Sequence, residues 1–258
     1  MHQSSYLSRT IGRILIGGLA LICAVTSAPA QSSADVKEAQ RLARVAQVAQ
    51  QQGRLDEAIR AYQTIAIVAK GSPAIAANAY LSAGNIYMAL GKYEEAGAAF
   101  RRSLSLDASS AEAQNNLGEA LGELKQYPRA LEAFQRAVAL DGRFLKARYN
   151  MGVTYDHMGQ LKYAEFVYRI LIRDYPDFVL AYDSLAVTLS KSGRAREAIA
   201  LHEKAISLDA KEPSFYYNFA VSYLVLGDIK HAREQQQKLR NLDPAMAEHL
   251  ASVIARHQ

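Results

Sequence analysis

Residues 84–100 read GNIYMALGKYEEAGAAF, and the spacing of their small and aromatic residues decides the fold. Gly84 and Tyr87 precede the glycine at position 91, and Ala96 and Phe100 follow it. Small and apolar residues three to four positions apart on both sides of a glycine are typical of two amphipathic helices joined by a tight turn. The stretch therefore predicts a helical hairpin whose backbones approach closely at the small residues.

The same hairpin pattern recurs six times along the chain. The small residue of the second helix falls at Ala58, Ala96, Ala130, Ala164, Ala198 and Ala232, so one interval is 38 residues and the next four are 34. The bulky residue four positions later is Tyr62, Phe100, Phe134, Tyr168, His202 and Gln236. The turn position reads Gly53, Gly91, Lys125, Gly159, Gly193 and Gly227. Because one hairpin cannot bury its apolar face alone, the copies must stack and share a continuous core.

This 34-residue pattern strongly resembles the tetratricopeptide repeat family. The resemblance covers roughly residues 39–246 and implies an all-α, right-handed α-solenoid of about six helical hairpins. The expected copies are 39–76, 77–110, 111–144, 145–178, 179–212 and 213–246, after a polar lead-in at 31–38. Residues 244–258 place Met246, Leu250, Val253 and Ile254 on one face and are expected to form a capping helix.

The chain departs from the family pattern at the opening aromatic of the copies. This residue is Tyr80, Tyr182 and Tyr216 in three copies, but Leu42, Gln114 and Arg148 in the other three. We expect those three copies to pack more loosely at that end. The first copy also carries a four-residue insertion around Gly71.

The first 30 residues have the composition of a secretory signal peptide. Two arginines precede an apolar run at residues 14–25, and Ala28-Pro29-Ala30 provides a small-residue cleavage site. We expect cleavage after Ala30 and therefore a periplasmic or secreted protein. An uncut segment would instead tether the chain to the membrane. Lipidation at Cys23 is disfavoured, because Ile22 is too large for the position before a lipidated cysteine.

Charge and cysteine content exclude several classes of function. Cys23 is the one cysteine, so the chain that remains after cleavage would have no disulfide. Loss of the two arginines would lower the formal net charge from +5 to +3. This small excess, without a basic run or an RNA-binding motif, argues against a nucleic-acid partner. No zinc-ligand spacing is present, and we expect neither a metal nor a cofactor.

In tetratricopeptide arrays the first helix of each hairpin lines the concave surface. The sixth position of each copy reads Arg44, Ser82, Asn116, Asn150, Ser184 and Asn218. An amide side chain both donates and accepts hydrogen bonds, so the three asparagines are expected to hold an extended partner segment by its backbone. The arrangement is similar to the asparagine ladder in the repeat domain of the O-linked N-acetylglucosamine transferases. In the alternative interpretation these amides bond locally or to water.

Two tyrosines flank this ladder. Tyr149 and Tyr217 stand beside Asn150 and Asn218, and each would offer a ring and a hydroxyl to a ligand. The alternative is that they pack against the neighbouring copy.

A second resemblance concerns the members of the family that clamp a carboxylate at the C-terminus of a chaperone. Asn85, Asn116 and Lys146 fall at matching clamp positions. Leu81 and Asn150 replace two of the clamp's cations, which argues against high-affinity carboxylate capture. Lys146 is instead expected to pair with a single acidic group of a partner.

The sequence predicts a protein that is not an enzyme. No G-x-S-x-G or H-E-x-x-H motif and no phosphate-binding glycine loop occurs in it. His157 beside Asp156 is the one cluster that invites a catalytic interpretation, but adjacent helical residues do not face the same way.

These features together predict a scaffold that binds a protein or peptide partner in assembly or secretion at the bacterial envelope. The alternative is a glycan-associated adaptor in polysaccharide export or synthesis, because aromatic rings and amides also suit sugars. The oligomeric state stays open at this level.

Overall fold

The computed structural model describes residues 34–69 and 71–257, so the expected signal segment lies outside the described residues. The chain divides into two compact units at Phe144, and each unit is described by itself. Unit 1 contains α2 (Ala34–Gln51), α3 (Leu55–Val68), α4 (Pro73–Ala89), α5 (Tyr93–Leu106), α6 (Ala111–Glu123) and α7 (Tyr127–Leu140). Unit 2 contains α8 (Leu145–His157), α9 (Leu161–Asp174), α10 (Val179–Lys191), α11 (Ala195–Leu208), α12 (Pro213–Val225), α13 (Ile229–Arg240) and α14 (Pro244–Ala255).

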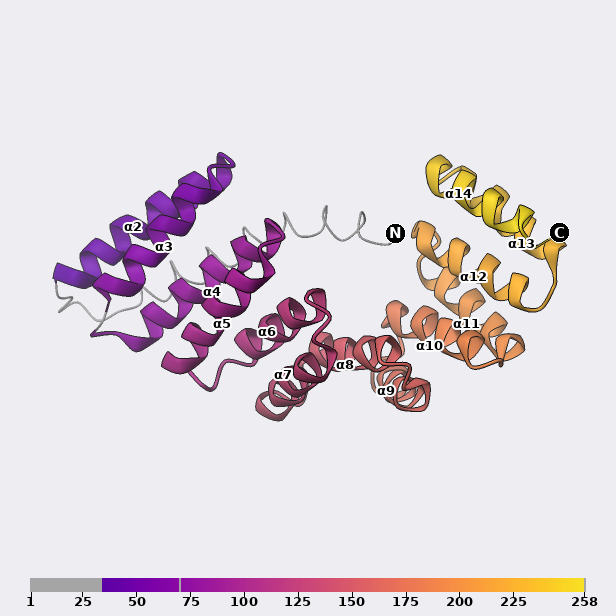
Figure 1. The fold of residues 1–258 in the computed structure, drawn as a ribbon, viewed down its shortest axis with the longest axis horizontal. Helices are drawn as coiled ribbons and strands as arrows, with labels where there is room; N and C mark the ends of the chain where they lie inside the picture. Colours follow the sequence, from indigo (N-terminus) through magenta and orange to yellow (C-terminus); the bar gives the residue numbers. More distant parts are fainter. Residues whose placement is uncertain (1–33, 70, 258) are drawn as a thin grey trace. The chain divides into compact units, whose positions relative to one another are not determined.

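Within each unit the helices form hairpins that stack in chain order (Figure 1). Within each unit an even-numbered helix, other than the final helix α14, is the first helix of a copy, and the odd-numbered helix after it runs back alongside. Every regular element in the described residues is an α-helix, and the prediction of an all-α solenoid of helical hairpins is confirmed. Helix α2 begins at Ala34, so it includes residues 34–38 of the predicted lead-in.

Small residues on the first helices allow the two helices of a hairpin to touch. A Cβ atom built on Gly84 would lie 2.4 Å from the ring of Phe100, and one built on Gly118 would lie 2.6 Å from Phe134. The same atom on Gly152 would lie 2.5 Å from the ring of Tyr168. These rings are almost wholly buried. Each ring therefore occupies the space that a side chain on the facing helix would need.

We predict that Gly118→Ala lowers the free energy of unfolding by about 1–3 kcal/mol, because the added methyl group overpacks the contact with Phe134. Gly122→Ala on the same helix is the matched control, since a Cβ at that position meets nothing within 4 Å. The control should stabilise the protein by roughly 0.5–1 kcal/mol through helix propensity. Urea denaturation of both variants checks the difference, and equal effects would contradict the packing argument.

The turns inside the hairpins place one residue in the left-handed region. The five turn glycines have φ between 70° and 81°, and Lys125 takes the same conformation with φ 57°. A side chain is disfavoured there because its Cβ approaches the following carbonyl oxygen.

Lys125→Gly is accordingly expected to raise the free energy of unfolding by about 1 kcal/mol, and Gly159→Ala should lower it by a similar amount. Thermal and urea unfolding of the two variants would test this reciprocal effect. A destabilising Lys125→Gly would show that the lysine side chain contributes more than its backbone conformation costs.

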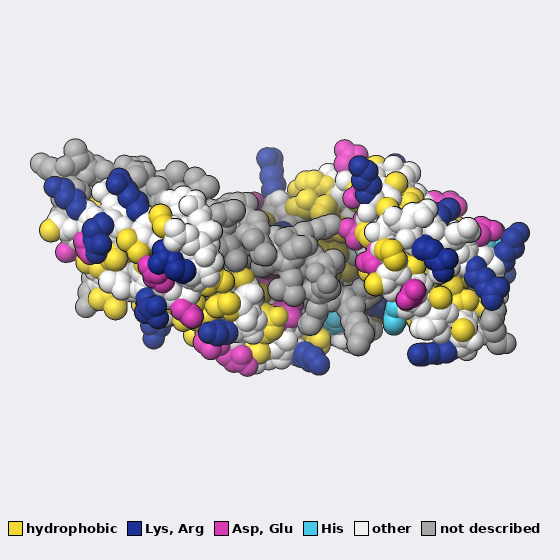
Figure 2. All heavy atoms as spheres, turned by 90° about the horizontal axis from the view of Figure 1, so that it is seen from above, with side chains coloured by type: hydrophobic (Ala, Val, Ile, Leu, Met, Phe, Trp, Pro, Cys, Tyr) yellow, Lys and Arg dark blue, Asp and Glu magenta, His cyan; other side chains and the backbone are white. Residues whose placement is uncertain are grey.

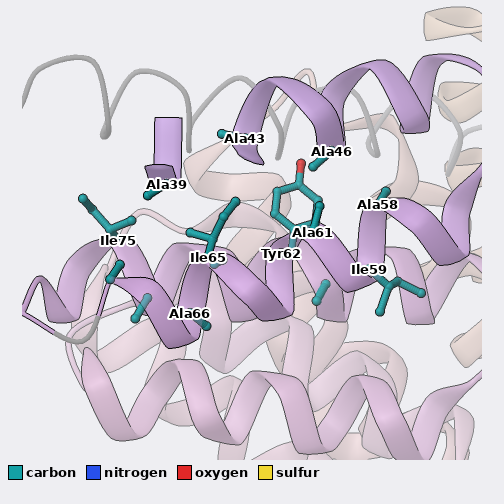
Figure 3. Close-up of a cluster of buried hydrophobic side chains, with 14 of the residues drawn as sticks. Ala39, Ala43, Ala46, Ala58, Ile59, Ala61, Tyr62, Ile65, Ala66 and Ile75 are labelled. Carbon is teal, nitrogen blue, oxygen red and sulfur yellow. The ribbon is translucent and has the colours of Figure 1, made fainter. Parts of the chain in front are cut away.

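The core of each unit follows from the same spacing. In unit 1, Ala39, Ala43 and Ala46 of α2 face Tyr62 and Ile65 of α3 across a buried cluster (Figure 3). In unit 2 the final helix α14 packs on α12 and α13 through residues that include Ala247, Leu250 and Ile254. The Asp243 side chain caps α14 by accepting a hydrogen bond from the Met246 amide at 2.9 Å.

Candidate functional site

Several first helices of neighbouring copies lie against one another, although α2 and α4 do not. In unit 2, α8 contacts α10, α10 contacts α12 and α12 contacts α14, and in unit 1 α4 contacts α6. Among the described residues no such contact joins α9, α11 and α13 to one another, or α5 to α7. The first helices therefore converge, and we call the surface on which they meet the first-helix face of each unit.

The predicted ladder residues of unit 1 lie at a seam between two first helices. The Asn116 side-chain amide on α6 donates to Asn85 Oδ1 on α4 at 2.8 Å. Asn115, which is fully buried, donates to Asn116 Oδ1 at 3.0 Å. Asn116 thus uses both its donor and its acceptor inside the array. This geometry gives the residue a role in stacking the copies.

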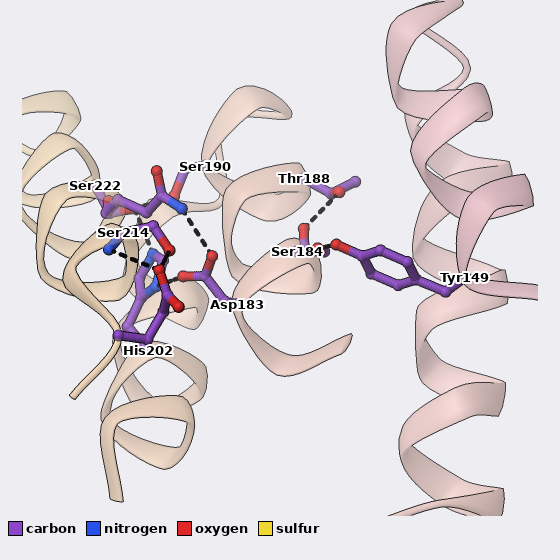
Figure 4. Close-up of polar contacts among 10 residues, drawn as sticks. Tyr149, Asp183, Ser184, Thr188, Ser190, His202, Ser214 and Ser222 are labelled. Carbon is purple, nitrogen blue, oxygen red and sulfur yellow. Dashed lines mark hydrogen bonds and ion pairs between the residues drawn. The ribbon is translucent and has the colours of Figure 1, made fainter. Parts of the chain in front are cut away.

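Two seams of unit 2 contain the same kind of contact. The Asn218 amide on α12 donates to Asp183 Oδ2 on α10 at 2.7 Å. The hydroxyl of Tyr149 on α8 lies 3.0 Å from Ser184 Oγ on α10 (Figure 4). The Tyr149 ring also meets the ring of Phe178 edge-on, with 5.5 Å between centroids. Tyr149 is therefore half-buried between two copies.

The remaining predicted residues lie on α8 and α12. Tyr217 stacks on His249 of α14 with 5.8 Å between the ring centroids, and its hydroxyl lies 3.2 Å from His249 Nδ1. Lys146 and Asn150 are both half-buried on α8. The structure thus brings Asn85 together with Asn116 in unit 1, while it places the other five predicted residues in unit 2.

A buried polar network on the same side of unit 2 was missed by sequence reasoning. His202 on α11 is 0% exposed, with Nδ1 2.9 Å from Asp183 Oδ1 and Nε2 2.9 Å from Ser222 Oγ. Ser222 Oγ also lies 2.8 Å from Ser190 Oγ and 3.1 Å from the Asn218 carbonyl oxygen (Figure 4). The one available signal was that histidine stands at the position that is Tyr or Phe in four other copies.

The side chains of Asp183, His202 and Ser222 are connected in the order of a catalytic triad. Their burial and their contacts instead indicate a structural role. Asp183 is 7% exposed and Ser222 is 1% exposed, so the hydroxyl oxygen faces no solvent. A nucleophilic serine needs a vacant approach for substrate and donors for the developing oxyanion. The three close partners of Ser222 Oγ occupy that space instead. The network joins α10, α11 and α12.

The preceding copy carries a related network around Asp156. The hydroxyls of Tyr168 and Thr188 donate to Asp156 Oδ2 at 3.2 Å and 2.8 Å. Burial raises the pKa of the Tyr168 hydroxyl, and the neighbouring Asp156 carboxylate raises it further. The Tyr168 hydroxyl therefore stays protonated at neutral pH, where it can donate to the carboxylate. His157, beside Asp156 in the sequence, is exposed.

We predict that Ser222→Ala lowers the free energy of unfolding by about 1–3 kcal/mol, because it leaves buried polar atoms of His202 and Ser190 without a partner. Ser252→Ala on α14 is the control: its hydroxyl is exposed and bonds only to the His249 carbonyl. The control should change the free energy by less than about 0.5 kcal/mol. Guanidinium chloride denaturation compares the two, and equal values would show that the network adds no stability.

Other kinds of site find little support in the described residues. No group of three or more His, Cys, Asp or Glu side chains lies close enough to hold a metal ion in residues 34–69 and 71–257. In the same ranges no helix is both long and apolar enough to cross a membrane. On the face shown in Figure 2, basic and acidic side chains are interspersed over the described surface.

The geometry defines an α-helical repeat protein in which stacked hairpins present a first-helix face. Models of the tetratricopeptide repeat match residues 111–144, 146–177 and 179–208, and a further TPR repeat model matches residues 84–125. The crystal structure of MamA is 32% identical to this chain, with a TM-score of 0.58 over 65% of this chain and 95% of MamA. The chain belongs to the tetratricopeptide repeat family.

Two further solved structures share the fold at lower identity. PilW, described as a widely conserved type IV pilus biogenesis factor, is 24% identical with a TM-score of 0.70 over 84% of this chain and 98% of PilW. YrrB, described as a TPR protein with an unusual peptide-binding site, is 22% identical with a TM-score of 0.55 over 73% of this chain and 97% of YrrB. No curated protein sequence matches the chain significantly.

Proposed function

We propose that this protein is an exported, non-catalytic scaffold that binds a segment of a partner protein along a first-helix face, in assembly or secretion at the bacterial envelope. The observation that carries the proposal is the convergence of α8, α10, α12 and α14. Their contacts bring side chains from successive copies onto one surface, as an extended peptide requires.

The chemistry of this surface in unit 2 suits a peptide. Lys146 and Asn150 of α8 and Tyr217 of α12 are half-buried, so each combines a fixed position with some access to solvent. An amide, a cation and a phenol ring can together contact peptide units, an acidic side chain and an apolar side chain. Asn116 and Asn218 contribute differently, because their amides hold Asn85 and Asp183 across the seams.

Export and an envelope role are supported by the N-terminal sequence. The basic start, the short apolar run and Ala28-Pro29-Ala30 have the order of a secretory signal peptide. PilW, a pilus biogenesis factor, shares the fold, but at 24% identity that likeness concerns the fold alone. The partner is therefore sought in an envelope extract.

The test compares two triple variants of the chain that begins at Gln31. Lys146→Ala, Asn150→Ala and Tyr217→Ala alter the first-helix face of unit 2 and spare Asn218, whose loss would disturb the buried network. Lys162→Ala, Tyr163→Ala and Phe166→Ala on α9 are the matched control, since Tyr163 is 60% exposed and Phe166 is 64% exposed on a second helix. Both variants are first checked for helicity by circular dichroism.

Affinity capture should recover a specific protein with the control but not with the first-helix variant. The affinity of the identified partner should fall by about tenfold or more, since about 1.4 kcal/mol of lost contact energy corresponds to tenfold. Equal capture by both variants would contradict the proposal. Retention of the chain on immobilised envelope polysaccharide, with loss in the same variant, would favour the glycan adaptor instead.

A further inference from the structure

Unit 1 has a hollow on the side of its second helices, and the proposed function does not use it. It lies between the second helices α5 and α7 and over α6, and its volume is about 500 Å³. A smaller hollow of about 120 Å³ shares Arg101, Leu121 and Arg129 with it. Sites that bind small ligands typically span about 300–1,000 Å³. The space is therefore large enough for a side chain of a partner.

This copy lacks an aromatic ring at a position that borders the hollow. Gln114 lines it and stands at the copy position of Tyr182 and Tyr216. Both tyrosines are buried, and their hydroxyls donate to the carbonyl oxygens of Pro176 at 2.9 Å and Ala210 at 3.1 Å. Glutamine provides no ring at this position, and the hollow lies beside it. This copy is one of the three for which the sequence predicts looser packing.

The side chain of Gln114 has an acceptor without a hydrogen bond. The side chain is 9% exposed, and its Oε1 atom is buried with no hydrogen-bond partner in the described residues. A buried acceptor without a hydrogen bond is unfavourable relative to a bonded one. A ligand that supplies an N–H or O–H donor here would therefore satisfy a need that the chain leaves open.

The surrounding charges define the rest of the ligand. In the preceding copy the guanidinium of Arg102 lies over the ring of Tyr80, 5.6 Å from its centroid. Arg136 stands 34 residues after Arg102 and lines the hollow, but the ring that it would cover is missing. Arg101 and Arg129 also line the hollow, and Glu132 supplies the one carboxylate in its lining. In the described part of the chain neither Arg101 nor Arg136 forms an ion pair.

We propose that this hollow binds a tyrosine side chain from a partner segment whose flanking residues are acidic. The incoming ring replaces the aromatic residue missing at Gln114 and lies under the Arg136 guanidinium, which favours it through a cation–π contact. A donor of the segment bonds to Gln114 Oε1, and the flanking carboxylates pair with Arg101 and Arg129. This site is separate from the first-helix face, so it stands or fails independently of the proposed function.

The probe is the capped peptide Glu-Asp-Tyr-Glu-Asp, titrated against the chain from Gln31 to Gln258 and followed by calorimetry. Gln114→Tyr is the decisive variant, because it fills the hollow with the residue found in the other copies. It should raise the melting temperature and weaken the peptide by about tenfold or more, as expected when an anchor residue is excluded from its pocket. Absence of binding to the unmodified chain, or unchanged binding to Gln114→Tyr, would overturn the proposal.

A second variant and altered peptides separate the ring from the charges. The double variant Arg101→Glu with Arg136→Glu should abolish binding. The control is Arg60→Glu with Arg143→Glu, at two exposed arginines elsewhere in unit 1, and it should leave binding unchanged. Replacing the tyrosine of the peptide by alanine should also abolish binding. If the alanine peptide binds equally well, or anionic lipid vesicles bind and Gln114→Tyr does not weaken them, the hollow is a cationic surface that binds anions without specificity, and the proposal is wrong.

Discussion

The close approach of two helices within each hairpin is the constraint on which the rest of the structure depends. Gly84, Gly118 and Gly152 let an aromatic ring from the second helix lie where a side chain would otherwise stand. This contact determines the separation of the helices. The separation then determines how neighbouring hairpins stack, because each hairpin buries its remaining apolar side against the next.

The two copies with a tyrosine ring supply a half-buried partner for its hydroxyl. The hydroxyl of Tyr62 donates to Gln50, and the hydroxyl of Tyr168 donates to Asp156. In the two copies with Phe100 and Phe134, the positions that correspond to Gln50 and Asp156 are Met88 and Gly122. The match between the two positions follows from the cost of an unsatisfied buried polar atom. Gln114 stands at a different position of its copy, where its Oε1 atom has no partner among the described residues and a hollow lies beside it.

Two asparagines on the first-helix faces form hydrogen bonds between neighbouring copies. The sequence could place Asn85, Asn116 and Asn218 on first helices, because a 34-residue period assigns each residue to a helix and a position within it. It did not predict that Asn116 bonds to Asn85 or that Asn218 bonds to Asp183. These bonds join residues 31 and 35 positions apart across two copies, and the repeat period alone does not specify such pairs. The accessible part of the face is correspondingly smaller than the ladder suggested.

The sequence by itself determined the hairpins, their number and their turns, because small, aromatic and turn residues act within one or two helical turns. Lys125 illustrates this, since it takes the same left-handed conformation as the glycines that stand at its turn position in other copies. The tertiary structure alone decided that His202 would be wholly buried between Asp183 and Ser222, and that a hollow would open beside Gln114. Both depend on the volume left between three helices, and that volume is set by packing between copies rather than by the pattern within one.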